Sequence, residues 1–251
     1  WYKGIGSAIP GHGGAVLLYS STDLKNWQYR NVFFADPTGV TGMTYECPDY
    51  FKINGKDVLI TCGPDAKQKQ FARTSWWVGT VRDFKFYPEK NDAFDGGLFY
   101  GGKTLVDNRG RYIMFAFAGD PRPVSQLWGW HDNLSLPRQI KLLPDNTLVA
   151  EPVEELKSLR NDHQHIENIR LDAVHGQSMI LLDSIKGDTL EMIIKFKPSS
   201  ARRFGLMLGC SSDLKDCEKL YYDRDLQEFY HTYRQCPMPL SENDPDRKSV
   251  V

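Results

Sequence analysis

The stretch that decides the fold is YIMFAF at residues 112–117, an apolar run that closely follows a turn signal at residues 108–110. Three similar runs precede it, AVLLY at 15–19, VLITC at 58–62 and SWWVG at 75–79. All are short, rich in β-branched or aromatic side chains and separated by turn residues, which is the pattern of strands. No segment before residue 150 keeps a helical period beyond about two turns. We therefore expect an all-β fold.

The chain divides into two β regions in this interpretation. Residues 1–150 carry blocks of several strands and one polar turn cluster each, which fits the blades of a β-propeller, although a sandwich fits almost as well. Residues 151–170 are charged, break the strand rhythm and are predicted to be a linker. Residues 171–236, with an alternating run at 188–196, are predicted to begin a β-sandwich, and residues 237–251 to form a disordered tail.

Composition narrows the classes of function. Hydrophobic residues make up 41% and charged residues 25%, as in ordinary soluble domains, and the formal net charge of −1 argues against nucleic acid as the main partner. No apolar run of about 18 residues predicts a membrane helix. The 5 cysteines lack metal-site spacing, so we expect no metal and no cofactor. The compartment is left open, with a secreted or extracellular protein plausible, and the glycosylation triplet at 133–135 matters only in that case.

Two carboxylates stand three residues apart in an apolar and aromatic neighbourhood. Glu46 lies between Tyr45 and Cys47, and Asp49 follows Pro48. If these neighbours desolvate Glu46, it can donate a proton near neutral pH, and Asp49 can hold an arginine that organises the pocket. The alternative is a surface glutamate at a strand end and an aspartate that forms a turn.

The stretch ECPD at 46–49 resembles the acid/base motif of glycoside hydrolase family 32, the invertase and fructanase family. Its flanks agree with the same family. Residues 14–27 are similar to its S-x-D-L-x-x-W turn, residues 95–104 to its D-x-G-x-F-Y-A segment, and residues 129–138 to its G-W-x-x-x-L-S-x-P-R segment. The likeness continues weakly through residues 221–224.

The resemblance implies a five-bladed β-propeller, incomplete in this chain, followed by the beginning of a C-terminal β-sandwich. It implies cleavage of terminal β-fructofuranosyl units of sucrose, fructans or fructo-oligosaccharides with retention, for which two carboxyl groups must lie about 5–5.5 Å apart. Glu46 takes the catalytic acid/base role. Tyr45, Asp49, Asp95 and Trp130 are the expected substrate contacts. Whether hydrolysis or fructosyl transfer dominates, which linkage is preferred and the oligomeric state are left open.

The sequence departs from the family pattern at two catalytic positions. The family nucleophile lies in an N-D-P-N-G motif and a stabilising aspartate in an R-D-P motif, and this sequence contains neither. We interpret the chain as a fragment that lacks the N-terminal part, and predict that these 251 residues alone do not hydrolyse sucrose. The rival hypotheses are a non-catalytic, sugar-binding β-propeller module and a related propeller glycosidase that acts on arabinose- or xylose-containing chains.

Overall fold

The computed structural model describes residues 1–36, 42–64, 72–94, 99–119, 129, 133–171, 178–187, 189–198, 200–211, 214 and 217–232. It divides the chain into two compact units, Trp1–Ser158 and Leu159–Val251. Within the described residues, no helix has both the length and the apolar character that a membrane span requires. The expected tail at 237–251 lies outside the described residues.

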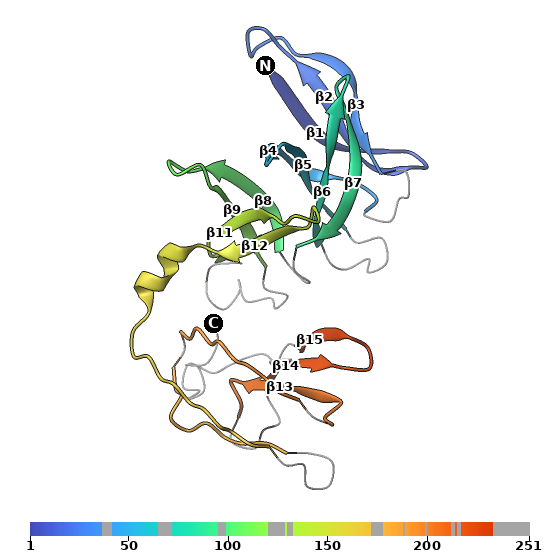
Figure 1. Ribbon diagram of the computed structural model, residues 1–251. Coiled ribbons are helices and arrows are strands. Elements are labelled where there is room, and N and C mark those ends of the chain that lie inside the picture. Colours follow the sequence, from blue (N-terminus) through green and yellow to red (C-terminus); the bar gives the residue numbers. More distant parts are fainter. Residues whose placement is uncertain are drawn as a thin grey trace. The chain divides into compact units, whose positions relative to one another are not determined.

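The first unit is built from three antiparallel sheets whose described strands follow one another along the chain (Figure 1). The first sheet holds β1 (Tyr2–Ile9), β2 (Gly13–Ser20) and β3 (Gln28–Ala35). The second holds β4 (Glu46–Ile53), β5 (Lys56–Pro64), β6 (Ala72–Arg82) and β7 (Lys85–Ala93). The third holds β8 (Phe99–Val106), β9 (Tyr112–Ala118), β10 (Asn133–Leu134), β11 (Arg138–Leu142) and β12 (Leu148–Pro152). Successive antiparallel sheets of consecutive strands are the blades of a propeller. The predicted all-β class is confirmed, and the number of five blades stays a prediction.

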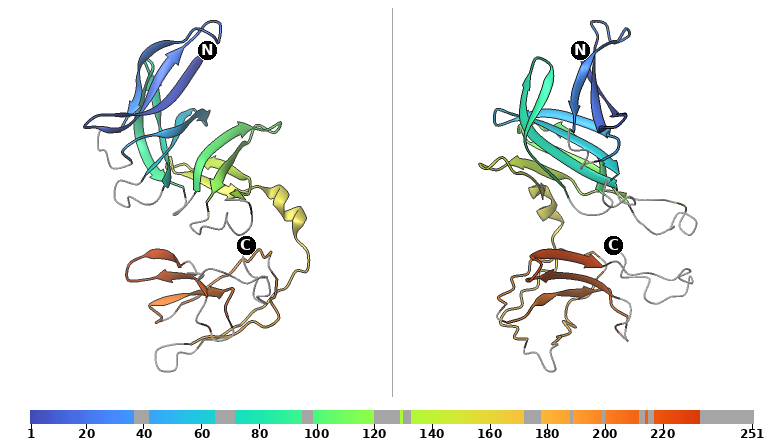
Figure 2. Two further views of the ribbon diagram at one scale, coloured as in Figure 1. Left: turned by 180° about the vertical axis from the view of Figure 1, so that it is seen from behind. Right: turned by 90° about the vertical axis from the view of Figure 1, so that its right-hand side faces the viewer.

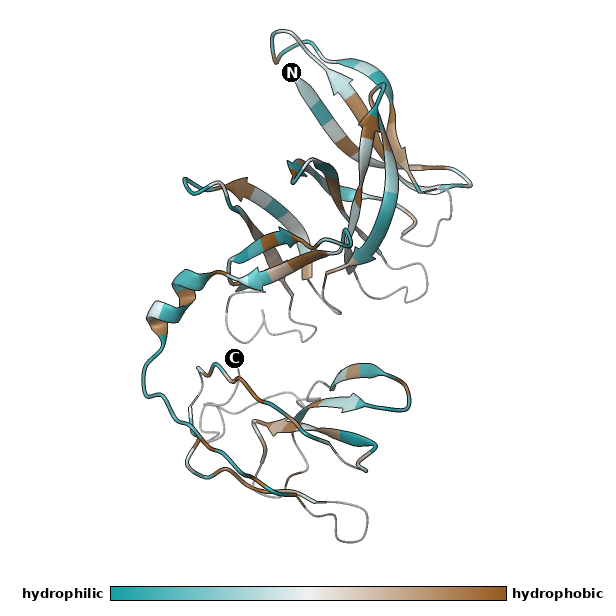
Figure 3. Cartoon of the chain, in the orientation of Figure 1, coloured by the Kyte–Doolittle hydropathy of each residue, from teal (hydrophilic) through white to brown (hydrophobic). Residues whose placement is uncertain are grey.

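The middle sheet is buried on both faces because a sheet packs against each of them. Along β5, Val58 and Ile60 belong to a core cluster shared with the third sheet, whereas Leu59 between them belongs to a cluster shared with the first. On β6, Trp76 and Trp77 divide in the same way, since successive side chains of a strand point to opposite faces. Both tryptophans are therefore core residues. Figure 3 shows apolar segments alternating with polar ones along the strands of this unit.

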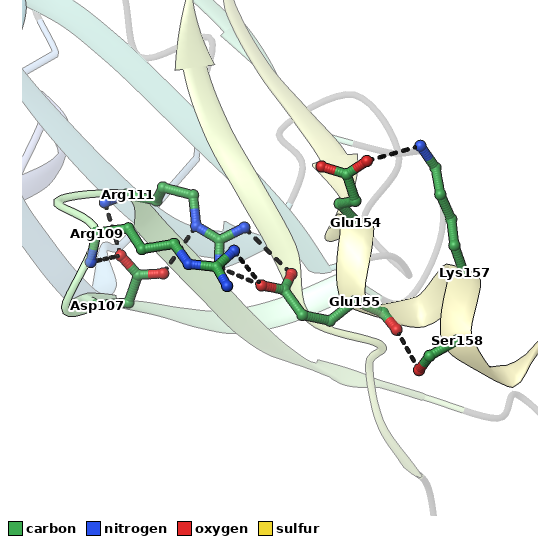
Figure 4. A network of polar contacts seen from close by, with 7 residues as sticks. All are labelled: Asp107, Arg109, Arg111, Glu154, Glu155, Lys157 and Ser158. Carbon is green, nitrogen blue, oxygen red and sulfur yellow. Dashed lines mark hydrogen bonds and ion pairs between the residues drawn. The ribbon is translucent and has the colours of Figure 1, made fainter.

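A short 3-10 helix, η1 (Glu154–Leu159), follows β12 and is held by the turn between β8 and β9 (Figure 4). Arg111 donates to Asp107 at 2.7 Å and to both oxygens of Glu155 at 2.7 and 3.1 Å, while Arg109 donates to Glu155 at 3.0 Å. The hydrogen bond from Arg111 is the main reason why the pKa of Glu155 is lowered. This network ties the end of the first unit to the turn between two strands of its third sheet.

The second unit contains, in its described part, one antiparallel sheet of β13 (Arg203–Leu208), β14 (Glu218–Asp223) and β15 (Glu228–Thr232). A disulfide between Cys210 and Cys217 closes the connection from β13 to β14. The strand expected near residues 188–196 is wrong for the described residues of that run, which belong to no sheet. Leu190 and Ile193 are 50% and 79% exposed, whereas the ring of Phe196 lies 5.3 Å from that of Phe204 on β13. Figure 2 shows this sheet in two further views.

Candidate active site

Glu46 begins β4 at a β-bulge. Glu46 pairs with Cys62 of β5, but Asp49 pairs with Ile60, so β4 carries one residue more than its partner between these pairs. Cys47 lies inside the bulge with a φ of 48°, in the left-handed region that costs a non-glycine residue about 1–2 kcal/mol. Bulges bend a strand and re-aim a side chain beside an active site. The bulge therefore sets the direction of the Glu46 side chain.

The carboxylate of Glu46 is joined to the third sheet by Tyr100. The hydroxyl of Tyr100, on β8, donates to Oε2 of Glu46 at 2.5 Å. Burial, then this hydrogen bond and the charge of Glu46, raise the pKa of Tyr100 well above its usual value. Tyr100 therefore stays protonated, and a donor, over the whole physiological range of pH.

Asp49 is held by the same strand. Its Oδ2 accepts two hydrogen bonds of 2.7 Å from Thr104, one from the backbone N–H and one from the hydroxyl. In the part of the chain that the structure describes, its partner is thus a threonine of β8, where the sequence suggested an arginine. Asp49 therefore fixes the far end of the bulge to the third sheet.

The thiol of Cys62, the residue that pairs with Glu46, is buried. Cys62 is 1% exposed, and its Sγ accepts a hydrogen bond of 3.1 Å from the N–H of Gly101. Thr74 Oγ1 lies 3.4 Å from the same sulfur and donates to the carbonyl of Phe99 at 2.5 Å. Burial raises the pKa of the Cys62 thiol, which keeps it neutral. Cys62 therefore supports the backbone of β8 as an uncharged acceptor.

The apolar environment expected around Glu46 is wrong for the described residues. Glu46 and Cys47 are exposed, and Met43 is 68% exposed. Of the side chains expected to desolvate the carboxylate, Met43 and Cys47 are exposed to solvent, and Tyr45 is buried in the core. What holds the carboxylate is the hydroxyl of Tyr100.

The other predicted contacts fall in different places. Tyr45 is 1% exposed and packs in the core, with its ring stacked 6.1 Å from that of Phe34, so we do not retain it as a substrate contact. Asp95 and Trp130 lie outside the described residues. Tyr100 and Thr104 were missed as site residues, although both lie in the segment that carried the family resemblance. No group of three or more potential metal ligands occurs among the residues that the structure describes.

In the comparison with known proteins, each of the two parts of the chain matches a family model. The family model of the N-terminal domain of glycosyl hydrolases family 32 matches residues 1–152, and the model of the C-terminal domain of that family matches residues 155–246. The sucrose-6-phosphate hydrolase of Vibrio alginolyticus is 30% identical over 225 residues, which cover 76% of this chain and 45% of that protein. The corresponding enzyme of Zymomonas mobilis is 28% identical over 250 residues, covering 90% and 48%.

A solved structure shares the fold. The GH32 β-fructofuranosidase of Bombyx mori superposes with a TM-score of 0.65 at 22% identity, over 95% of this chain and 52% of that one. The present chain spans about half the length of the curated relatives that it matches.

Proposed function

Since this chain belongs to glycosyl hydrolase family 32, we propose that the protein cleaves terminal β-fructofuranosyl linkages of sucrose or fructans with retention, and that Glu46 is its general acid and base. The names of the two curated relatives, both sucrose-6-phosphate hydrolases, support a β-fructoside as the substrate. No cofactor enters this chemistry.

The observation that carries the proposal is the exposed carboxylate of Glu46 at the bulge, with one oxygen bound to the hydroxyl of Tyr100. A general acid must reach the leaving oxygen of the substrate, which a buried carboxylate in the core cannot do. The bond to Oε2 restricts the rotation of the carboxylate. The second oxygen, Oε1, is then the one that carries the proton to the glycosidic oxygen.

The reaction needs a partner carboxylate. In the first step Glu46 protonates the leaving oxygen while a second carboxylate attacks the anomeric carbon and forms a fructosyl-enzyme. In the second step the ionised Glu46 takes a proton from a water molecule while the oxygen of that water attacks the anomeric carbon, which breaks the bond to the second carboxylate and releases fructose. The family motif for the nucleophile is missing from this sequence, so we propose that activity resides in a form of the protein that also contains the N-D-P-N-G and R-D-P motifs.

Three further residues have supporting roles in this proposal. Asp49 organises the bulge through Thr104. Asp95 contacts the sugar on the leaving-group side, and Trp130 lines the entrance to the site. The roles of Asp95 and Trp130 rest on the family resemblance of their segments.

The test compares fructose release from sucrose and inulin by the 251-residue chain, by a version extended at its N-terminus with its own coding sequence, and by variants of the active form. We expect Glu46→Gln to lower kcat by about 10²–10⁴-fold. The loss should shrink for an aryl β-fructofuranoside, whose good leaving group needs no proton. Glu89→Gln is the matched control, because Glu89 pairs with Lys56 on β5, away from the bulge.

Either part of the proposal can fail in this experiment. If no form releases fructose but the chain binds fructosides, the sugar-binding module is the better account. If Glu46→Gln leaves the kcat of an active form unchanged, the assignment of Glu46 as the acid is wrong.

A further inference from the structure

A lysine of β8 contacts the bulge between Glu46 and Asp49. The ammonium of Lys103 donates to the carbonyl of Cys47 at 3.2 Å and to the carbonyl of Pro48 at 2.7 Å. These are the two residues that lie between the paired positions of β4. One side chain therefore bridges both carbonyls of the irregular segment.

The bulge creates the need for such a contact. An extra residue disrupts the ladder of backbone hydrogen bonds, and carbonyls that lose their partners require another donor or water. An ammonium offers three donors and a positive charge, which makes its hydrogen bonds stronger than those of a neutral group. Lys103 thus donates to both carbonyls and connects them. One of the two belongs to Cys47, the residue with the left-handed backbone.

A second bulge allows Lys103 to reach that position. On β8, Tyr100 pairs with Phe117 but Lys103 pairs with Phe115, so β8 also carries one extra residue, and Gly101 has a φ of 64°. Tyr100 and Lys103 lie three residues apart, a spacing at which a regular strand points two side chains to opposite faces, yet both contact β4. The bulge on β8 is therefore matched to the bulge on β4.

We propose that Lys103 is a positioning residue for the general acid: its ammonium locks the bulge of β4 and so fixes the direction in which Glu46 presents its carboxylate. The consequence for catalysis rests on the proposed function, whereas the effect on the backbone does not. The competing account is a surface lysine whose two contacts restrain nothing.

The first measurement is hydrogen exchange of the 251-residue chain, followed by mass spectrometry of the peptide that spans residues 46–53. Lys103→Met keeps the aliphatic stem and removes every donor, whereas Lys103→Arg keeps donors and charge. Lys141→Met is the control, since Lys141 pairs with Glu151 on β12. We expect exchange in this peptide to rise about tenfold in Lys103→Met and by less than about threefold in the other two variants. Equal exchange in all four proteins overturns the proposal.

The second measurement uses the form of the protein that releases fructose. Lys103→Met should lower kcat on sucrose by about 10–100-fold, with KM within about threefold of the wild type, because a displaced acid weakens the chemical step more than binding. Lys103→Arg should restore most of kcat. If Glu46→Gln abolishes activity but Lys103→Met retains the full kcat, the positioning role fails while the proposed function stands. If Glu46→Gln has no effect, the proposed function fails and hydrogen exchange alone decides whether Lys103 locks the bulge.

Discussion

Replacing Gly6 by alanine should displace the backbone that carries Glu46, the proposed general acid. β1 lies beside the segment that precedes β4, where the N–H of Tyr45 donates to the carbonyl of Ser7 at 3.0 Å. A Cβ added at Gly6 would stand 2.3 Å from the carbonyl oxygen of Tyr45 and 3.0 Å from Cα of Glu46. Carbon and carbonyl oxygen approach no closer than about 3.3 Å in ordinary contacts, so the two backbones must separate by about 1 Å.

The expected loss of stability follows from that separation. Overpacking of a fitted contact costs about 1–3 kcal/mol, and a glycine-to-alanine change returns about 0.4–1 kcal/mol by restricting the unfolded chain. The free energy of unfolding of the first unit should therefore fall by about 1–2 kcal/mol. A shift of about 1 Å at Glu46 should also lower kcat of the active form by about 10²-fold.

Urea unfolding followed by tryptophan fluorescence isolates the first unit, because all 6 tryptophans lie within it. Gly4→Ala on the same strand is the matched control. Its added Cβ would meet only side-chain atoms, Cγ1 of Val16 at 3.3 Å and Cγ of Pro48 at 3.9 Å, which can move. If Gly6→Ala and Gly4→Ala unfold at the same urea concentration, the close approach of β1 to Glu46 does not restrain the site.

Other substitutions test the fold around the site. Glu155→Gln should lower the urea midpoint at pH 7. The hydrogen bond from Arg111 lowers the pKa of Glu155 in the folded state, so the ionised carboxylate stabilises the fold above its unfolded pKa of about 4.3, and the difference from wild type should shrink as pH falls below that value and through the lowered folded pKa. Met114→Ala should cost about 2–5 kcal/mol, since Met114 is 0% exposed, whereas Leu105→Ala, at a position 51% exposed, should cost under about 1 kcal/mol by the same urea assay. Cys62 should resist iodoacetamide until the first unit unfolds, and rapid labelling of the native chain, located by mass spectrometry, would contradict its burial.

Much of the first unit could be predicted from local pattern. The apolar runs at 58–62 and 75–79 both became strands of the middle sheet, because short runs rich in β-branched and aromatic residues favour buried strands. Successive side chains of a strand point to opposite faces, and a sheet covers each face of the middle sheet. Trp76 and Trp77 therefore lie in two different cores. The alternating run near residue 190 shows the limit of this reasoning, since a strand forms only where a neighbour supplies the hydrogen bonds.

The geometry of the site could not be predicted in the same way. Tyr45 was expected to contact the substrate, yet it is buried in the core. Adjacent residues of an extended chain point to opposite sides, and that rule alone would have separated Tyr45 from Glu46. The bulge at Cys47 had one local signal, Pro48, which lacks the N–H that a regular ladder requires. The donors that hold the bulge come from β8, more than 50 residues later, and no local pattern in β4 reports them.

The bulge that carries Glu46 is therefore held in place by contacts within this chain. A left-handed residue at Cys47 costs about 1–2 kcal/mol, whereas the charge-assisted hydrogen bonds from Lys103 and to Asp49 contribute about 1.5–3 kcal/mol each. The balance favours the bulged backbone before any substrate or second carboxylate is present. In the function proposed above, a nucleophile would then complete the retaining pair without any rearrangement of Glu46, so that the free energy needed to position the acid is not added to the barrier of the chemical step.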